Sequence, residues 1–223
     1  MDQEADVVQT GSGFTPIAGL NLSFMEDKLN IGIKYEFKTN LEITNETASD
    51  VITGSDGSSM FPDKEVINAD MPAMLSIGAK YQITDALNVH AGFHTYFDTK
   101  VNWKNVAEIE GNSMEYALGL EYNISEKLLV SAGWLGTKTG VKDTYHTDLS
   151  YSLNTNSIGG GGAFAINNMI TIQLGGFMTM YQDFTANKSY PLGDAAVPFK
   201  ETYKKSAWGV GIGLDFTFGG GGE

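Results

Sequence analysis

The end of the chain constrains the fold most, because residues 207–218 alternate strictly between large apolar side chains and small or polar ones. The even positions hold Trp208, Val210, Ile212, Leu214, Phe216 and Phe218, and the odd positions hold Ala207, Gly209, Gly211, Gly213, Asp215 and Thr217. A period of two places each set on one face of a β-strand. A strand that is large and apolar outside but small or polar inside fits a sheet whose outer solvent is lipid.

The composition agrees with a membrane β-protein and excludes several other classes. No apolar run approaches the roughly 18 residues of a membrane helix, so any span must be a strand. The net charge is −13 and the chain contains no arginine, which argues against nucleic-acid partners and excludes an arginine-lined anion pore. Cysteine is absent, so there is neither a disulfide framework nor a thiolate metal site.

The same alternation recurs along the chain and predicts nine strands. They are expected at 14–24, 29–43, 71–83, 87–97, 114–124, 128–137, 153–166, 170–181 and 202–218. Most match or exceed the roughly 9 to 11 residues with which a tilted strand crosses a bilayer. The connections alternate between tight polar turns, such as 26–28 and 84–86, and long segments at 45–65, 104–113, 138–149 and 183–201. This asymmetry is typical of outer-membrane barrels, which have short periplasmic turns and long external loops.

Aromatic side chains on the apolar face occur near both ends of the predicted strands. Phe24, Tyr81, Tyr122, Phe164 and Phe218 mark the ends with short turns, and Phe37, Phe97, Trp134 and Trp208 mark the ends with long loops. Two such belts are expected at the two membrane interfaces. A soluble β-sandwich also alternates, but it explains neither the belts nor the alternating connection lengths. The sequence therefore predicts an all-β, antiparallel, up-and-down transmembrane barrel.

The final strand, closing on Phe218, resembles the signal by which bacterial outer-membrane barrels are recognised for assembly. Five segments, GSGFTPIAGLN (11–21), LNIGIKYEFKT (29–39), MPAMLSIG (71–78), AGWLGTKTGV (132–141) and DLSYSL (148–153), resemble FadL-type outer-membrane transporters of long-chain fatty acids and aromatic hydrocarbons, in the version typical of Bacteroidetes. The resemblance implies a fourteen-strand barrel behind an N-terminal hatch, of which this chain would hold the last nine strands.

Strand direction leads to the same expectation. The first predicted strand runs into a short periplasmic turn, so residues 1–13 are expected on the external side. Because an exported chain begins in the periplasm, at least one strand and a signal peptide would precede these residues. Residues 14–218 would form the barrel strands with their long external loops, and 219–223 a glycine-rich tail. In the family, the hatch and a kinked early strand control ligand entry and exit; because both would lie upstream, none of those residues can be assigned here.

The charged residues of the polar face are expected to form a solvated network inside the barrel, and the alternative is a ligand site, for which this face offers the candidate contacts. They are Lys34, Glu36, Lys38, Lys80, His90, His94 and Tyr96, and Glu115 and Glu121 also point inward. His90 and His94 are roughly 13 Å apart along one strand, too far to chelate one ion. The 84–86 turn predicts that His90 faces Lys80 and that His94 faces Ser76, so neither gains a carboxylate within that hairpin. We expect both histidines to fill the lumen, with a haem or metal contact as the alternative.

Three further features carry little chemistry. His146 lies in a long loop and shows no partner in the sequence, and Gly159–Gly162 lacks the lysine and helix of a phosphate loop. The acidic residues Glu46, Asp50, Asp56 and Asp63 could collect divalent cations weakly, but they lack a regular ligand spacing. No supported order of nucleophile, histidine and acid appears, so we expect no enzyme activity and no cofactor.

The resemblance implies passive transport of hydrophobic compounds, in particular long-chain fatty acids, across the bacterial outer membrane. Expected partners are outer-membrane lipid and lipopolysaccharide, a hydrophobic small-molecule ligand, and the barrel-assembly machinery through the last strand. Two alternatives remain: a surface protein that binds haem or acts as an adhesin, and a barrel enzyme if a nucleophile and a histidine converge in space.

Overall fold

The structure is a computed structural model that describes residues 4–52, 57–103, 106–147, 150–192 and 195–218. Strands dominate it, and its helical elements are three short 3-10 turns, η1 (Asp98–Lys100), η2 (Val106–Glu108) and η3 (Asp143–Tyr145). Within these ranges, no helix has the length and apolar character needed to cross a membrane.

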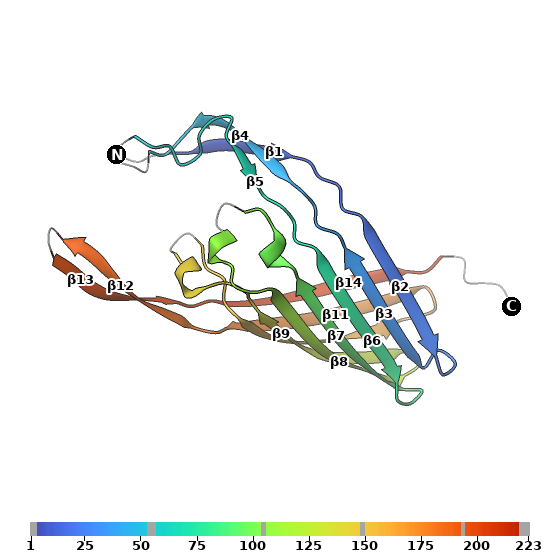
Figure 1. The fold of residues 1–223 in the computed structure, drawn as a ribbon. Coiled ribbons are helices and arrows are strands. Elements are labelled where there is room, and N and C mark those ends of the chain that lie inside the picture. Colours follow the sequence, from blue (N-terminus) through green and yellow to red (C-terminus); the bar gives the residue numbers. More distant parts are fainter. Residues whose placement is uncertain (1–3, 53–56, 104–105, 148–149, 193–194, 219–223) are drawn as a thin grey trace.

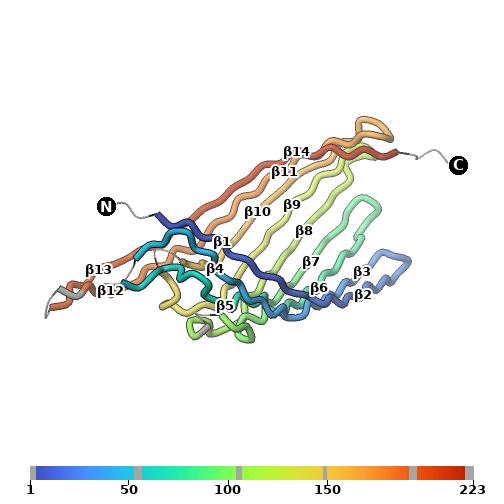
Figure 2. Tube along the Cα trace, turned by 90° about the horizontal axis from the view of Figure 1, so that it is seen from above, coloured from blue at the N-terminus to red at the C-terminus, as the bar shows by residue number. Residues whose placement is uncertain are grey.

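Nine strands form one antiparallel sheet in the order β14-β11-β10-β9-β8-β7-β6-β3-β2. They are β2 (Ile17–Phe24), β3 (Leu29–Glu36), β6 (Met74–Gln82), β7 (Leu87–Tyr96), β8 (Ser113–Ser125), β9 (Leu128–Lys138), β10 (Thr155–Ala165), β11 (Ile170–Tyr181) and β14 (Ser206–Phe216). Figures 1 and 2 show a curved wall of long strands whose two edges, β2 and β14, lie apart. The prediction of nine antiparallel barrel strands is confirmed.

Two strands of the wall are shorter than the sequence predicts. The second is expected to run to Ile43, but β3 ends at Glu36, and an isolated bridge between Thr39 and Met71 then leads from the β3–β6 pair to the β4–β5 pair. At this junction the buried carboxylate of Asp70 accepts hydrogen bonds from Lys38 Nζ at 2.9 Å and from the Leu41 amide at 3.1 Å. The ninth is expected to begin at Thr202, but β13 ends at Tyr203 and β14 begins only at Ser206.

The segments beyond these breaks form smaller sheets of their own. β4 (Glu42–Ser49) lies between β1 (Asp6–Gly11) and β5 (Val66–Asn68), and β12 (Phe184–Leu192) pairs with β13 (Ala195–Tyr203). Parts of the predicted long loops 45–65 and 183–201 are therefore strands. Figure 1 shows both small sheets at the end of the wall opposite the tight turns.

The wall has no conventional core. The buried apolar residues of the described chain are Ala73, Val101, Leu153 and Tyr203, and all four lie in or next to the segments beyond the loop ends of the strands. By contrast, Trp208, Val210 and Ile212 are 75%, 76% and 78% exposed. A soluble sandwich would cover such a face with a second sheet, and none of the described strands covers it. The bare apolar face is what a lipid-facing wall requires.

Candidate functional site

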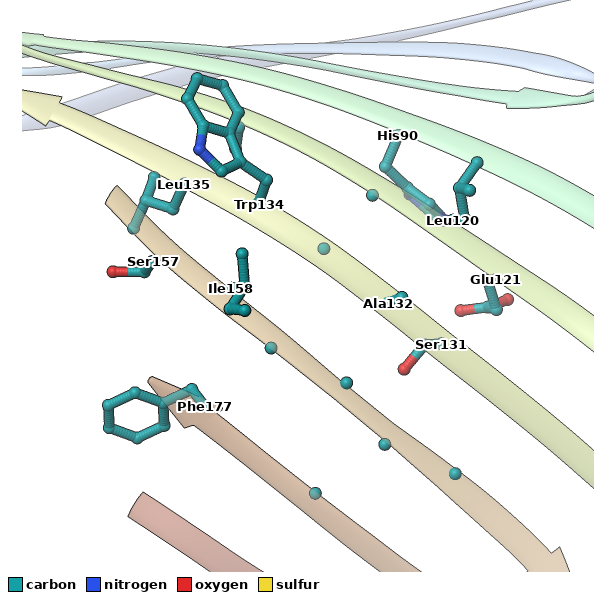
Figure 3. A pocket seen from close by; sticks show the side chains of 18 of the residues that line it. His90, Leu120, Glu121, Ser131, Ala132, Trp134, Leu135, Ser157, Ile158 and Phe177 are labelled. Carbon is teal, nitrogen blue, oxygen red and sulfur yellow. The ribbon is translucent and has the colours of Figure 1, made fainter. Parts of the chain in front are cut away.

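The inner face of the wall holds a wide trough of about 1270 Å³, floored by β7 to β11 and β14. Its polar lining residues come from the small and polar face: His90, Glu121, Ser131, Ser157, Gln173 and Thr179. Figure 3 shows how few side chains interrupt the floor between Glu121 and Phe177. The trough is therefore the candidate site for a solute moving along the wall.

Glycine makes this floor smooth. Cross-strand pairing places Gly119, Gly133 and Gly159 side by side on β8, β9 and β10, with His90 before them and Phe177 after them. Some glycines are needed by the packing itself, since a Cβ on Gly161 would lie 2.7 Å from the Leu174 carbonyl oxygen. A Cβ on Gly211 would meet nothing within 4 Å. At Gly211 no neighbour within the wall explains the missing side chain.

Most charged and histidine side chains of the inner face lie on β3, β6, β7 and β8, whereas Asp215 lies on β14. Lys34 Nζ lies 2.6 Å from Glu36 Oε1 on the same strand. Lys38 was expected on the same strand face, but it lies beyond the end of β3 and pairs with Asp70 at 2.9 Å. Of the candidate lysines, Lys34 and Lys38 therefore already have carboxylate partners.

His94 belongs to a polar cluster that the sequence showed only in part. Its Nδ1 lies 3.3 Å from Glu115 Oε2, which also accepts a hydrogen bond from the Tyr96 hydroxyl at 3.1 Å. The Thr137 hydroxyl donates to Glu115 Oε1 at 3.4 Å. The pairing of β7 with β8 brings Glu115 opposite His94. Both hydroxyls bond to Glu115 rather than to the imidazole of His94. The cluster therefore lacks the hydroxyl–histidine–acid order that activates a nucleophile.

Lys80 and His90 face each other across β6 and β7, and His94 faces Ser76, so the register predicted from the 84–86 turn is confirmed. Lys80 is exposed on the inner face and, within the described residues, forms no ion pair. His90 lines the trough. Lys80 therefore stands beside His90 without an ion-pair partner among the described residues.

The wall under the trough is continuous. The pairs β9–β10, β10–β11 and β11–β14 keep one register throughout, and the register of β8–β9 shifts only at Asn123 and Ser125, beside the tight turn. An unbroken hydrogen-bond ladder leaves no opening between strands. A solute in this part of the trough must therefore move along the wall and cannot pass through it.

The acidic residues at the loop end hold the backbone together. Asp50 accepts hydrogen bonds from the amides of Val51 and Phe61 and from the Ser59 hydroxyl, and these bonds lower its pKa despite an opposing desolvation effect. Asp63 accepts a hydrogen bond from the Thr47 amide at 3.0 Å. This bond is the main reason that the pKa of Asp63 is also lowered. Asp56 lies outside the described residues. Among those described, no three acidic or histidine side chains could hold a metal ion together.

His146 has partners that the sequence did not reveal. Its ring lies 4.3 Å from the ring of Phe184 and 5.8 Å from that of Tyr203, and only 6% of the residue is exposed. Its Nδ1 is buried without a hydrogen-bond partner in the described structure. Burial lowers the pKa of His146 below its usual 6.5. This aromatic cluster fastens the base of the β12–β13 hairpin to the segment after β9.

Comparison with known proteins supports the fold alone. No family model matches the chain, and no curated protein matches it. Among solved structures, a Pseudomonas aeruginosa FadL homologue matches with a TM-score of 0.64 and 15% identity, over 91% of this chain and 52% of that one.

Two other solved channels give the same picture. The toluene transporter TodX of P. putida matches with a TM-score of 0.54 and 14% identity, over 93% of this chain and 50% of its own. The CymD monoaromatic hydrocarbon channel matches with a TM-score of 0.53 and 14% identity, over 92% of this chain and 51% of its own. The chain therefore spans about half the length of the solved structures it matches.

The bare apolar face, the smooth inner face and the alternating connections define this chain as the wall of an antiparallel membrane-type β-barrel. Its fold is that of FadL-type channels, as the resemblance of its sequence segments implied.

Proposed function

We propose that the chain forms part of a bacterial outer-membrane barrel that conducts hydrophobic compounds and has no enzyme activity. The observation that carries this proposal is the contrast between the two faces of one continuous sheet: a bare apolar face outside and a glycine-floored trough inside. The likeness to solved channels for hydrophobic compounds supports it.

The dimensions of the trough support long-chain fatty acids as the cargo. From His90 to Phe177, the glycine row crosses four strand spacings, which corresponds to roughly 19 Å at about 4.8 Å per spacing. This length accommodates an extended long-chain acyl group. Gly119, Gly133 and Gly159 present no side chain that would obstruct it.

Lys80 supplies the contact for the carboxylate in this proposal. Lys34 and Lys38 are engaged by Glu36 and Asp70, whereas Lys80 forms no ion pair within the described part of the chain. A lysine offers a point charge rather than a planar fork, so it holds a carboxylate loosely. Loose binding suits a channel, because the solute must also leave.

Uptake of fluorescent fatty acids into lipid vesicles that carry the full-length protein tests the proposal. We expect uptake to depend on chain length more than on head-group charge, and Lys80→Met to slow the uptake of ionised fatty acids roughly threefold. Uptake of a neutral aromatic hydrocarbon should not change. Lys34→Met is the matched control, because Lys34 is already paired with Glu36.

The two parts of the proposal fail separately. Uptake no faster than vesicle leak for every hydrophobic compound would contradict the transport function. Transport of aromatic hydrocarbons without transport of fatty acids would leave the channel in place and contradict the fatty-acid assignment.

A further inference from the structure

The outer face of the wall carries a second hollow, behind the trough. This outer groove has a volume of about 570 Å³, and its walls are the apolar side chains of Leu128, Val130, Phe164, Ile172, Leu174 and Val210. Its floor is formed by Gly160, Gly162 and Gly176, which alternation places on the outer face. The groove contains no charged side chain.

The packing of the wall makes the outer groove permanent. A Cβ on Gly160, Gly162 or Gly176 would lie 3.1, 2.9 or 3.2 Å from a backbone oxygen of the neighbouring strand. Even alanine at these positions would require the strands to shift. Because β10 also has Gly159 and Gly161 on the inner face, the wall here is little more than one backbone thick.

The groove lies in the half of the wall nearest the tight turns. Leu128 is the first residue of β9, and Phe164 lies one residue before the end of β10. Lys127 stands in the turn at this end of the groove, where its carbonyl accepts a hydrogen bond from the Ala165 amide at 2.8 Å. Lys127 is exposed and, in the described part of the chain, has no ion-pair partner.

We infer that the outer groove binds one phospholipid of the periplasmic leaflet, with an acyl chain against the glycine floor and the phosphate near Lys127. This inference rests on the proposed function, because the short turns of an outer-membrane barrel lie on the periplasmic side. An apolar groove in a lipid-facing surface must be filled by hydrocarbon, because an empty groove forfeits contacts on one side. A cation at its interfacial end favours an anionic head group.

A photoreactive phosphatidylglycerol tests the inference in vesicles of phosphatidylethanolamine and phosphatidylglycerol that carry the full-length protein. Peptide mapping should place the crosslinks on β9, β10 and β11, in the groove. Val130→Phe fills the groove from its rim and should lower crosslinking there roughly tenfold. Leu120→Phe is the matched control, because Leu120 is an exposed apolar residue of the same wall outside the groove, and it should change nothing.

A second variant examines the head group. Lys127→Gln should reduce crosslinking by phosphatidylglycerol and leave crosslinking by an equally labelled phosphatidylethanolamine nearly unchanged. The same vesicles report hydrocarbon uptake, so a failure of the channel is recorded independently of the groove.

Four results would overturn the inference. Crosslinks spread evenly around the wall would show ordinary surrounding lipid. Crosslinking that survives Val130→Phe unchanged would show that the groove is not the site. Exclusive labelling of the groove by a photoreactive lipopolysaccharide, or its closure by a second copy of the protein, would assign it to another occupant.

Discussion

Asp70 is the residue on which the junction between the wall and the small N-terminal sheet depends. Only 4% of this residue is exposed, and it accepts hydrogen bonds from Lys38 Nζ and from the amides of Leu41 and Asn102, at 2.9 to 3.1 Å. These bonds keep its pKa low although burial opposes them. The carboxylate therefore links the ends of β3 and β7 and the start of β4.

Asp70→Asn should destabilise the folded protein by about 2 to 4 kcal/mol, because it removes a buried charge from its cationic partner and replaces an acceptor by a donor. Denaturant titration in lipid vesicles measures this. Asp27→Asn is the control, because Asp27 lies in an exposed turn at φ 65°, a conformation that asparagine tolerates. Equal stability of the two variants would contradict the role given to Asp70.

His146 makes the docking of the β12–β13 hairpin sensitive to pH. Because burial lowers the pKa of His146, the docked hairpin favours the neutral ring; Asp143 opposes this shift, and Lys188 adds to it. Docking is therefore strongest above the usual pKa of 6.5 and weakens as the pH falls from there through the lowered pKa. Lys188 and Glu201, which pair with each other beside Tyr203, stay charged over this range.

Limited proteolysis of the hairpin between pH 8 and pH 5 measures this effect. We expect cleavage to accelerate as the pH falls, and His146→Phe to remove most of the acceleration while preserving the ring contacts with Phe184 and Tyr203. Acceleration of the same size in His146→Phe would assign the pH dependence to another group.

At the scale of the strand, the glycines of the wall divide into two kinds. Gly161→Ala should destabilise the wall by about 1 to 3 kcal/mol, because its Cβ would lie 2.7 Å from the Leu174 carbonyl oxygen. Gly211→Ala should be neutral or stabilising by about 0.4 to 1 kcal/mol, because open space surrounds its Cβ and alanine restricts the unfolded chain. Unfolding titrations of both variants measure these changes in stability. Equal losses of stability in the two variants would contradict the distinction between the two kinds of glycine.

The wall strands could be predicted because their signal is local: each alternates between lipid and lumen residue by residue. The ends of β3 and β13 could not, since Glu42–Ser49 follows β3 in an extended conformation and the interruption involves contacts with residues distant in the sequence, such as the Leu41 amide with Asp70. The surroundings of His146 were missed for the same reason. Its carbonyl accepts the hydroxyl of Tyr203, 57 residues further along the chain.

The candidate site was predictable to a similar degree. The turn at 84–86 fixed the partners of His90 and His94 within their hairpin, and the structure confirms them. The bond from His94 to Glu115 required the register of the next hairpin, whose connection spans residues 97–112. A long connection leaves that register undefined in the sequence.

At the scale of the whole molecule, the nine-stranded sheet is a curved wall with two unpaired edges. β2 and β14 each present a row of backbone donors and acceptors, and in the described residues they do not pair with each other. Such edges are unfavourable in a membrane, where every backbone polar group needs a partner. The chain spans about half the length of the solved structures that it matches.

The central claim is that one sheet separates lipid from a water-accessible interior, and single-cysteine labelling along β8 tests it most directly. The chain has no cysteine, so each introduced thiol is unique. In lipid vesicles, a water-soluble thiol reagent should react roughly tenfold faster with Ala117→Cys and Gly119→Cys, on the inner face, than with Leu118→Cys and Leu120→Cys, on the lipid face. Equal reactivity at all four positions, or the reverse order, would contradict the claim.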